Sequence, residues 1–155
     1  GLPNVMGFVK NRYVGRTFIT PDQQSREQAV RIKLSALRSE VEGKRVVMVD
    51  DSIVRGTTCS QIIALLREAG AKEVHMRVSA PPFISPCYFG TDIPDKDRLI
   101  ACHHSIDEIR DMTGADSLDF LSLDNLQKLA PNARCGFCEG CFTEHYPIPV
   151  DGTAE

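Results

Sequence analysis

The sequence predicts an α/β protein in which a parallel sheet is flanked by helices, followed by an irregular tail that carries cysteines. Two patterns lead to this prediction. Short apolar runs alternate along the chain with segments of helical periodicity, as in proteins built from strand–helix–strand units. From Pro131 to Glu155 there is no such periodicity, and three cysteines fall in this stretch. We therefore expect an α/β domain over residues 1–130 and a cysteine-rich tail over residues 131–155.

Composition and charge limit the classes of function. The chain has 155 residues, of which 42% are hydrophobic and 25% are charged, so it is long enough to bury one core. We find neither an apolar run of the roughly 18 residues that cross a bilayer nor a signal-peptide pattern. We therefore expect a cytoplasmic protein with no membrane partner. The net charge of −3 argues against nucleic-acid binding, which usually requires a basic face.

The first elements are expected to be a strand, a loop and a helix. The strand runs from Asn4 to Lys10 and leads into a flexible basic loop, and residues 1–24 hold both. The helix runs from Ser25 to Leu37, where the apolar residues have near-helical spacing. Ser25 and Gln28 form a capping-box pattern at its start.

A strand–helix–strand unit is expected in the middle of the chain. The stretch from Arg45 to Val49 contains a continuous apolar run, which is typical of a strand buried on both faces of a parallel sheet. A helix follows from Thr58 to Ala69, and Gly70 is a natural residue to end it. The next strand runs from Glu73 to Ser79, and the three elements together form a right-handed unit.

Shorter elements follow a proline-rich, irregular segment. They are expected as a short strand at 99–101, a helix at 105–114, a strand at 118–121 and a helix at 122–130. Ser105 and Glu108 have the spacing of a capping box, and Gly114 suits the end of that helix. Cys59 and Cys102 lie on predicted helix and strand positions and are expected to be small buried residues.

The most informative segment runs from Val46 to Thr58. It predicts a buried strand that delivers two carboxylates, Asp50 and Asp51, to its carboxyl end, followed by a turn rich in Gly, Thr and Ser and by a helix start. Ligands of open α/β sheets bind beyond this end of the strands. Amides at a helix start suit a phosphate, and adjacent carboxylates suit sugar hydroxyls or Mg²⁺. The acid pair by itself fits a solvated turn before a helix equally well.

The whole segment resembles the signature of type I phosphoribosyltransferases that binds phosphoribosylpyrophosphate (PRPP). Its Ser-Ile-Val-Arg-Gly-Thr-Thr part, residues 52–58, is similar to that of the amidophosphoribosyltransferase family. The resemblance implies a partial type I phosphoribosyltransferase fold, in which Asp50 and Asp51 contact the ribose hydroxyls and Mg²⁺. It further implies that the 5′-phosphate is held by Ser52, Arg55, Gly56, Thr57 and Thr58.

A basic loop from Lys10 to Ile19 is similar to the same family. A basic loop with a glycine hinge can fold over a diphosphate, neutralise its charge and exclude water. In the family this segment is a flexible loop that closes over bound PRPP. The resemblance implies that the closing residues are Lys10, Arg12, Tyr13 and Arg16.

Three cysteines near the end of the chain indicate a metal site. Cys135, Cys138 and Cys141 are each separated by two residues, whereas a secreted disulfide framework spreads its cysteines along the chain. With Cys87 or His145 as a further ligand they suit zinc, in a Cys₄ or Cys₃His site. Idle thiols are another interpretation, and C-x-x-C spacing by itself does not distinguish the metals.

The sequence around these cysteines resembles the iron–sulfur class of the amidophosphoribosyltransferase family. The two contexts are Ser85-Pro86-Cys87-Tyr88-Phe89-Gly90 and Cys138-Glu139-Gly140-Cys141-Phe142-Thr143. The resemblance implies a [4Fe–4S] cluster held by Cys87, Cys138 and Cys141, with the structural role of tying the tail to the domain. The family's fourth ligand lies upstream of residue 1, and the spacing of Cys135 makes it the candidate substitute.

The resemblance also implies a reaction and partners. In the family, a glutaminase domain releases ammonia from glutamine, and the ammonia displaces diphosphate from PRPP. The product is 5-phosphoribosylamine, in the first committed step of purine biosynthesis. Such a displacement depends on positioning and charge neutralisation, so we expect no proton-transfer catalyst in this chain. The whole enzyme is expected to be a homotetramer inhibited by purine nucleotides.

The chain is expected to be a fragment, and two other functions are alternatives. The chain starts inside the phosphoribosyltransferase domain, so we expect a fragment that is inactive with glutamine. A free-standing salvage phosphoribosyltransferase, which joins a nucleobase to PRPP, leaves the terminal cysteines unexplained. A non-catalytic, PRPP-sensing regulator of transcription predicts an added DNA-binding region with a basic helix, which the sequence does not show.

Overall fold

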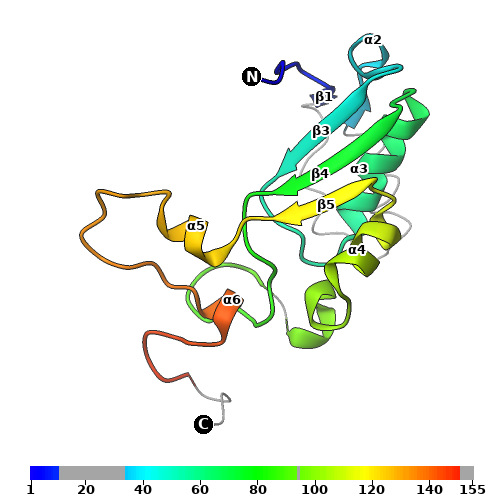
Figure 1. Cartoon of the computed structure of the whole chain (residues 1–155). Helices are drawn as coiled ribbons and strands as arrows, with labels where there is room; N and C mark the ends of the chain where they lie inside the picture. The colour runs from blue at the N-terminus through cyan, green and yellow to red at the C-terminus, as the bar shows by residue number, and fades with distance from the viewer. Residues whose placement is uncertain (11–33, 94, 151–155) are drawn as a thin grey trace. The chain divides into compact units, whose positions relative to one another are not determined.

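A computed structural model (Figure 1) describes residues 1–10, 34–93 and 95–150. The chain divides into two compact units built from interleaved segments. The first unit combines Gly1–Met48, Gly56–Met76 and Arg110–Ser117, and the second combines Val49–Arg55, Arg77–Ile109 and Leu118–Glu155. A boundary between a domain and a tail at residue 130 stays a prediction.

The described chain contains a parallel sheet with the strand order β3-β4-β5 (Figure 1). Its strands are β3 (Arg45–Asp50), β4 (Glu73–Val78) and β5 (Ser117–Phe120), which confirms the three strands predicted for these stretches. Helix α3 (Thr57–Glu68) connects β3 to β4, and α4 (Ile106–Thr113) precedes β5. Neighbouring strands joined through a helix are the units expected from the sequence, so the α/β class is confirmed.

One face of β4 lies in the core. Val74, Met76 and Val78 are at most 4% exposed, whereas the residues between them are half-buried. The buried side chains of α3 are Cys59, Ile63 and Leu66. Their spacing places them on one side of the helix, and the predicted burial of Cys59 is confirmed.

The outer residues of β3 are open to solvent. Val47 and Val49 are 45% and 70% exposed, so the prediction that this strand is buried on both faces is wrong. When every residue of a strand is apolar, the alternation that marks a half-buried strand is lost from the sequence. A continuous apolar run therefore cannot tell one buried face from two.

Helix α3 begins and ends next to glycines in the left-handed region. Gly56 is its N-cap with φ 77°, and Gly70 follows its C-cap Ala69 with φ 94°. Glycine adopts this region without the steric cost that a β-carbon brings. The helix predicted at 58–69 and its glycine end are both confirmed.

A separate antiparallel pair is formed in the first unit by β1 (Phe8–Lys10) and β2 (Leu34–Ala36), with Phe8 opposite Ala36. The predicted strand at 4–10 is thus shortened, and the predicted helix reaching Leu37 is wrong at β2. Pairing with β1 outweighs the weak helical preference of these residues. The rest of that predicted helix, residues 25–33, lies outside the described residues. A short helix that was not predicted, α2 (Arg38–Val41), follows β2.

Two 3₁₀ turns, η2 (Lys96–Arg98) and η3 (Ile100–Cys102), occupy the place of the strand predicted at 99–101, which is wrong. The amide of Cys102 bonds to the carbonyl of Leu99, in the i→i+3 pattern of these turns. Leu99 is fully buried and packs with Phe83 and Ile93. The apolar residues that suggested a strand are therefore buried by a turn.

Side-chain caps start the last two predicted helices. The Ser105 amide donates to Glu108 Oε2 (2.7 Å) and the Glu108 amide donates to Ser105 Oγ (3.3 Å), which confirms the capping box of α4. Helix α5 (Leu123–Gln127) is shorter than predicted, and the Ser122 hydroxyl oxygen accepts from the Asn125 amide at its start.

The tail contains a short helix that no periodicity predicted, α6 (Gly140–Thr143). Its position is set by contacts within the second unit, which are described below. Among the helices of the described residues, none combines the length and the apolar content that crossing a membrane requires.

Candidate functional site

The two acidic residues that end β3 are held in place by local hydrogen bonds in the second unit. The Asp51 amide donates to Asp50 Oδ1 (3.0 Å), and the Ser52 hydroxyl donates to Asp51 Oδ1 (3.0 Å). The Ser79 amide donates to the Asp50 carbonyl oxygen (2.9 Å), which ties the end of β3 to the residue after β4. The carboxylates are thus placed at the carboxyl end of the sheet, where ligands of α/β proteins bind.

The electrostatics of the pair favour a bound cation or hydrogen-bond donors. Burial of Asp50 raises the pKa of its carboxyl group, and the neighbouring Asp51 carboxylate raises it further. The hydrogen bond from the Asp51 amide acts in the opposite direction. Two adjacent carboxylates repel each other, and a bound cation or a set of hydroxyl donors relieves that repulsion.

Apolar residues anchor the loop that follows the acid pair. Ile53 is 3% exposed, and the Val54 carbonyl oxygen accepts from the Ile100 amide (2.9 Å). Val54 also packs against the buried cluster of Phe83, Ile93 and Leu99. Arg55 is exposed. The loop is therefore fixed by its apolar side chains, while Arg55 is accessible.

In the first unit, Gly56 starts α3 without a side-chain cap among the described residues. Its carbonyl oxygen accepts from the Ser60 amide (3.0 Å), which closes the first turn. The first turn contains no acidic residue, so no protein carboxylate competes there for the positive end of the helix dipole. This arrangement suits an anion at the helix start, as predicted from the sequence.

The structure describes some of the predicted ligand-binding residues and not others. Asp50, Asp51 and Ser52 are joined by hydrogen bonds, and residues 55–58 continue the chain into α3. Lys10 is the exposed last residue of β1. Arg12, Tyr13 and Arg16 lie outside the described residues. Their predicted contacts with PRPP and Mg²⁺ stay predictions.

The cysteines predicted to bind iron lie near one another in the second unit. Cys141 is half-buried, and burial raises the pKa of its thiol; charge on Cys87 and Cys138 raises it further. The pKa of Cys87 is lowered, chiefly by a hydrogen bond from the Phe89 amide, with Thr91 and Gly90 contributing and burial opposing. Both Cys87 and Cys141 pack against the buried cluster around Leu99.

These thiols do not form a complete metal site. Within residues 1–10, 34–93 and 95–150, no group of three or more His, Cys, Asp or Glu side chains is arranged to hold a metal ion. Cys135 and Cys138 are exposed. A [4Fe–4S] cluster requires four ligands, usually all cysteine thiolates, and zinc requires a tetrahedral set. Cys141 interacts with Cys87 and with Cys138, but the described residues do not form the ligand set of either metal.

Several contacts of the tail had no signal in the sequence. Tyr146 contacts the loop that carries Cys87, and Lys96 forms an ion pair with Glu144. Outside the tail, Cys102 is only half-buried, so the prediction that it is a buried residue is wrong. Its thiol donates to the Ile84 carbonyl oxygen (3.3 Å). A lone tyrosine or lysine in an irregular segment has no periodicity or motif that could mark it.

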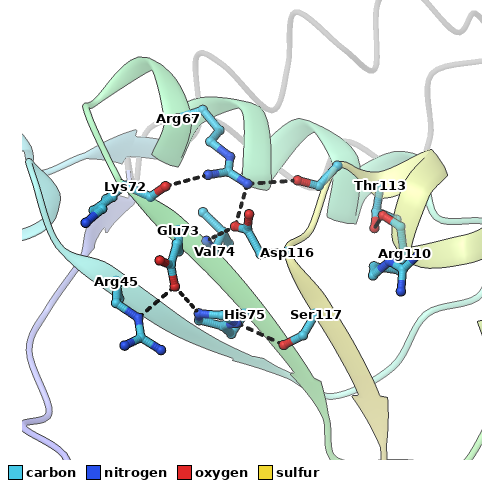
Figure 2. A network of polar contacts seen from close by, with 11 residues as sticks. Arg45, Arg67, Lys72, Glu73, Val74, His75, Arg110, Thr113, Asp116 and Ser117 are labelled. Atoms are coloured by element: carbon cyan, nitrogen blue, oxygen red, sulfur yellow. Dashed lines mark hydrogen bonds and ion pairs between the residues drawn. The ribbon is translucent and has the colours of Figure 1, made fainter. Parts of the chain in front are cut away.

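A polar network in the first unit was also missed (Figure 2). Glu73 Oε2 accepts from Arg45 Nε (2.7 Å) and from His75 Nε2 (3.0 Å), and in the neutral ring His75 Nδ1 accepts from the Ser117 hydroxyl (2.9 Å). The hydrogen bond from His75 is the main reason that the pKa of Glu73 is lowered. These residues come from β3, β4 and β5, so the network ties the three strands together.

Comparison with known proteins gives a consistent result. The model of the phosphoribosyl transferase domain family matches residues 8–82. The amidophosphoribosyltransferase of Bacillus subtilis is 55% identical over 154 residues, which cover 97% of this chain and 32% of that protein. The chloroplastic amidophosphoribosyltransferase 2 of Arabidopsis thaliana is 54% identical over 96% of this chain and 26% of its own length.

Solved structures agree with the sequence relatives. One, described as the allosteric regulatory enzyme of purine biosynthesis, has a TM-score of 0.81 and 54% identity, and the match covers 98% of this chain and 34% of that chain. Another, a glutamine PRPP amidotransferase from B. subtilis complexed with ADP and GMP, has a TM-score of 0.79 and 54% identity over 97% of this chain and 34% of that one. The chain therefore spans about a third of the length of the proteins it matches.

Proposed function

Since residues 8–82 match the model of the phosphoribosyl transferase domain family and nearly the whole chain matches part of amidophosphoribosyltransferase, we propose that this chain is the PRPP-binding part of such an enzyme. The reaction breaks the bond between C1 of the ribose and diphosphate and forms a bond from C1 to the nitrogen of ammonia. The ammonia comes from glutamine, a proton is released, and the product is 5-phosphoribosylamine.

One observation carries this proposal: the hydrogen-bonded pair of carboxylates at the end of β3 is followed directly by the turn that enters α3 at Gly56. Carboxylates suit the ribose hydroxyls and a Mg²⁺ ion on the diphosphate, and a helix start without an acidic residue suits the 5′-phosphate. In this proposal Asp50 and Asp51 hold the ribose and Mg²⁺. The residues that cradle the phosphate are Ser52, Arg55, Gly56, Thr57 and Thr58.

These residues contribute to the reaction by positioning the substrate. When bound, Mg²⁺ neutralises charge on the leaving diphosphate. The carboxylates orient the ribose so that C1 faces the incoming ammonia, and fixed geometry of this kind lowers the barrier without proton transfer. Lys10, Arg12, Tyr13 and Arg16 are proposed to close over the diphosphate and exclude water.

The whole enzyme supplies further partners in this proposal. A glutaminase domain provides ammonia, the enzyme assembles as a homotetramer in the cytoplasm, and purine nucleotides inhibit it. One structural neighbour was solved with ADP and GMP bound, which supports nucleotide regulation. The cysteine contexts support membership of the iron–sulfur class, but no step of the reaction is assigned to a cluster because the described thiols form no complete site.

The two other functions are less well supported. A salvage phosphoribosyltransferase shares the PRPP loop, and so does a PRPP-sensing regulator, so the loop by itself does not exclude them. However, the similarity to amidophosphoribosyltransferases extends over 97% of the chain and includes the cysteine tail. That extent favours the amidotransferase.

Calorimetric titration of PRPP into the full chain with Mg²⁺ tests the proposal. We expect binding by the wild type and, because a charge-assisted contact is lost, at least about a tenfold weaker affinity for Asp51→Asn. Asp111→Asn is the matched control, since Asp111 is an exposed acid on α4 whose side chain bonds to Arg110. Absence of binding by the wild type, or an unchanged affinity in Asp51→Asn, contradicts the proposal.

A further inference from the structure

The tail segment that carries Cys138 and Cys141 is attached to the loop of Cys87 through Tyr146. The Tyr146 hydroxyl lies 2.7 Å from the Ser85 hydroxyl oxygen and 2.7 Å from the Pro86 carbonyl oxygen, to which it donates. Ser85 is only 3% exposed, and a buried hydroxyl needs a hydrogen-bond partner. The polar end of Tyr146 therefore satisfies a buried group next to Cys87.

The Tyr146 ring adds apolar contacts to the hydrogen bonds of its hydroxyl group. It meets Tyr88 edge-on, with ring centroids 5.1 Å apart and an interplanar angle of 77°, and Phe89 at 6.1 Å and 65°. These are favourable geometries for aromatic pairs. The ring also lies against Gly140, where a β-carbon would overlap it. Glycine at the start of α6 is thus required by the ring.

The main chain of the cysteine segment joins the same contact. The carbonyl oxygen of Cys141 accepts from the amides of Ile84 (3.0 Å) and Ser85 (3.1 Å). The rings of Phe83 and Phe142 pack with centroids 4.9 Å apart. Every one of these interactions is between protein groups of the second unit, and none of them involves a thiol group.

We infer that Tyr146 is a positioning residue that docks the Cys138–Cys141 segment beside Cys87 in the metal-free protein. This differs from the role implied by the family resemblance, in which a cluster ties the tail to the domain. The contacts that place the tail, from the Tyr146 hydroxyl and the Cys141 carbonyl, use no thiol group. The inference concerns the tail and does not depend on whether PRPP binds.

Amide hydrogen exchange of the chelator-treated full chain, with iron and zinc measured to show their removal, tests this inference. The amides of Ile84 and Ser85 report on docking because their acceptor is the Cys141 carbonyl. The amide of Leu121, which donates to the Val78 carbonyl, reports on the rest of the second unit. We expect the first two to be protected in the metal-free wild type.

Tyr146→Phe keeps the ring and removes both hydroxyl contacts, so we expect roughly tenfold faster exchange at Ile84 and Ser85, since each hydrogen bond contributes modestly. Gly140→Ala is expected to have the same effect, because the added β-carbon displaces the Tyr146 ring while residue 146 itself stays a tyrosine. Tyr88→Phe is the matched control because the Tyr88 hydroxyl makes neither of the two contacts, and it should exchange like the wild type. Exchange at Leu121 should stay unchanged throughout.

Two results overturn the inference. One is that the Ile84 and Ser85 amides are unprotected in the metal-free wild type and gain protection only after iron and sulfide, or zinc, are added. The other is that Tyr146→Phe and Gly140→Ala both exchange like the wild type. Either result means that a metal site, or other contacts of the tail, docks the cysteines in place of Tyr146.

Discussion

At the scale of single residues, the burial of Asp50 in the acid pair carries a cost to folding. The pKa of Asp50 is raised because burial disfavours its charged form. For an acid whose pKa is higher in the folded than in the unfolded protein, the stabilising contribution is present at low pH. It is lost as the pH rises through the folded pKa. At neutral pH the ionised Asp50 therefore weakens the folded state.

Asp50→Asn is accordingly expected to raise the free energy of unfolding at about pH 7 by about 0.5–1 kcal/mol, the usual gain when a functional strain is removed. The amide oxygen of Asn can still accept from the Asp51 amide. Urea unfolding measures the difference, which should vanish at about pH 3, where the wild-type carboxyl group is protonated. A destabilised variant at neutral pH contradicts this reading of Asp50.

Gly56 is the other residue whose conformation matters at the site. Its φ of 77° lies in the left-handed region, where a β-carbon costs about 1–2 kcal/mol. We expect Gly56→Ala to lower the free energy of unfolding by that amount. Gly136→Ala serves as its control, because Gly136 does not have a positive φ and a β-carbon there meets no atom within 4 Å. Equal midpoints for the two variants in a urea titration are the result that would argue against strain at Gly56.

At the scale of elements, the strand–helix–strand units are joined by a side-chain bridge (Figure 2). Asp116 Oδ2 accepts from the Val74 amide (2.6 Å) and from Arg67 Nη2 (2.6 Å). Arg67 also donates to the carbonyl oxygens of Lys72 (3.0 Å) and Gly114 (3.3 Å). Helix α3, the start of β4 and the residue before β5 are thereby held together in the first unit.

Asp116→Ala is expected to lower the free energy of unfolding at neutral pH by about 1–3 kcal/mol, because the Val74 amide loses its acceptor. The hydrogen bond from Val74, followed by Arg67, lowers the pKa of Asp116. A lowered acid pKa means that the contribution is present above the unfolded pKa and is lost as the pH falls through the folded one. The difference from wild type, followed by urea unfolding, should therefore shrink in acid.

The control for this bridge is Asp119→Ala. Asp119 forms an exposed ion pair with Arg77 (3.2 Å), and such pairs contribute about 0–1 kcal/mol. If Asp116→Ala lowers the free energy of unfolding no more than Asp119→Ala does, the bridge is an ordinary surface pair.

At the scale of the whole molecule, the chain has about a third of the length of its relatives. We therefore expect it to lack the glutamine-dependent part of their activity. These 155 residues expressed alone, supplied with PRPP, Mg²⁺ and glutamine, should release no glutamate. Ammonium salt in place of glutamine is the control, because it separates loss of the ammonia source from loss of the PRPP site. Sustained glutamate formation in a coupled assay is the outcome that rules out this expectation.

Features set by neighbouring residues were predicted from the sequence. Helix α3 ends at Gly70, α4 starts with Ser105 and Glu108, and the acid pair follows β3. Each depends on residues within a few positions of one another, where capping, glycine conformation and periodicity act. The predicted PRPP loop is also a continuous stretch of sequence, so a resemblance to a family signature can identify it.

Features that depend on distant partners were decided only by the tertiary structure. β2 exists because of its pairing with β1. In β3, Val47 and Val49 are exposed while the residue between them is half-buried. Residues 99–101 form a turn because Leu99 enters a core. Tyr146 reaches Ser85 across 61 positions of sequence. Hydrogen bonds and packing between such residues leave no local pattern, because each partner is an ordinary residue until the fold brings the two together.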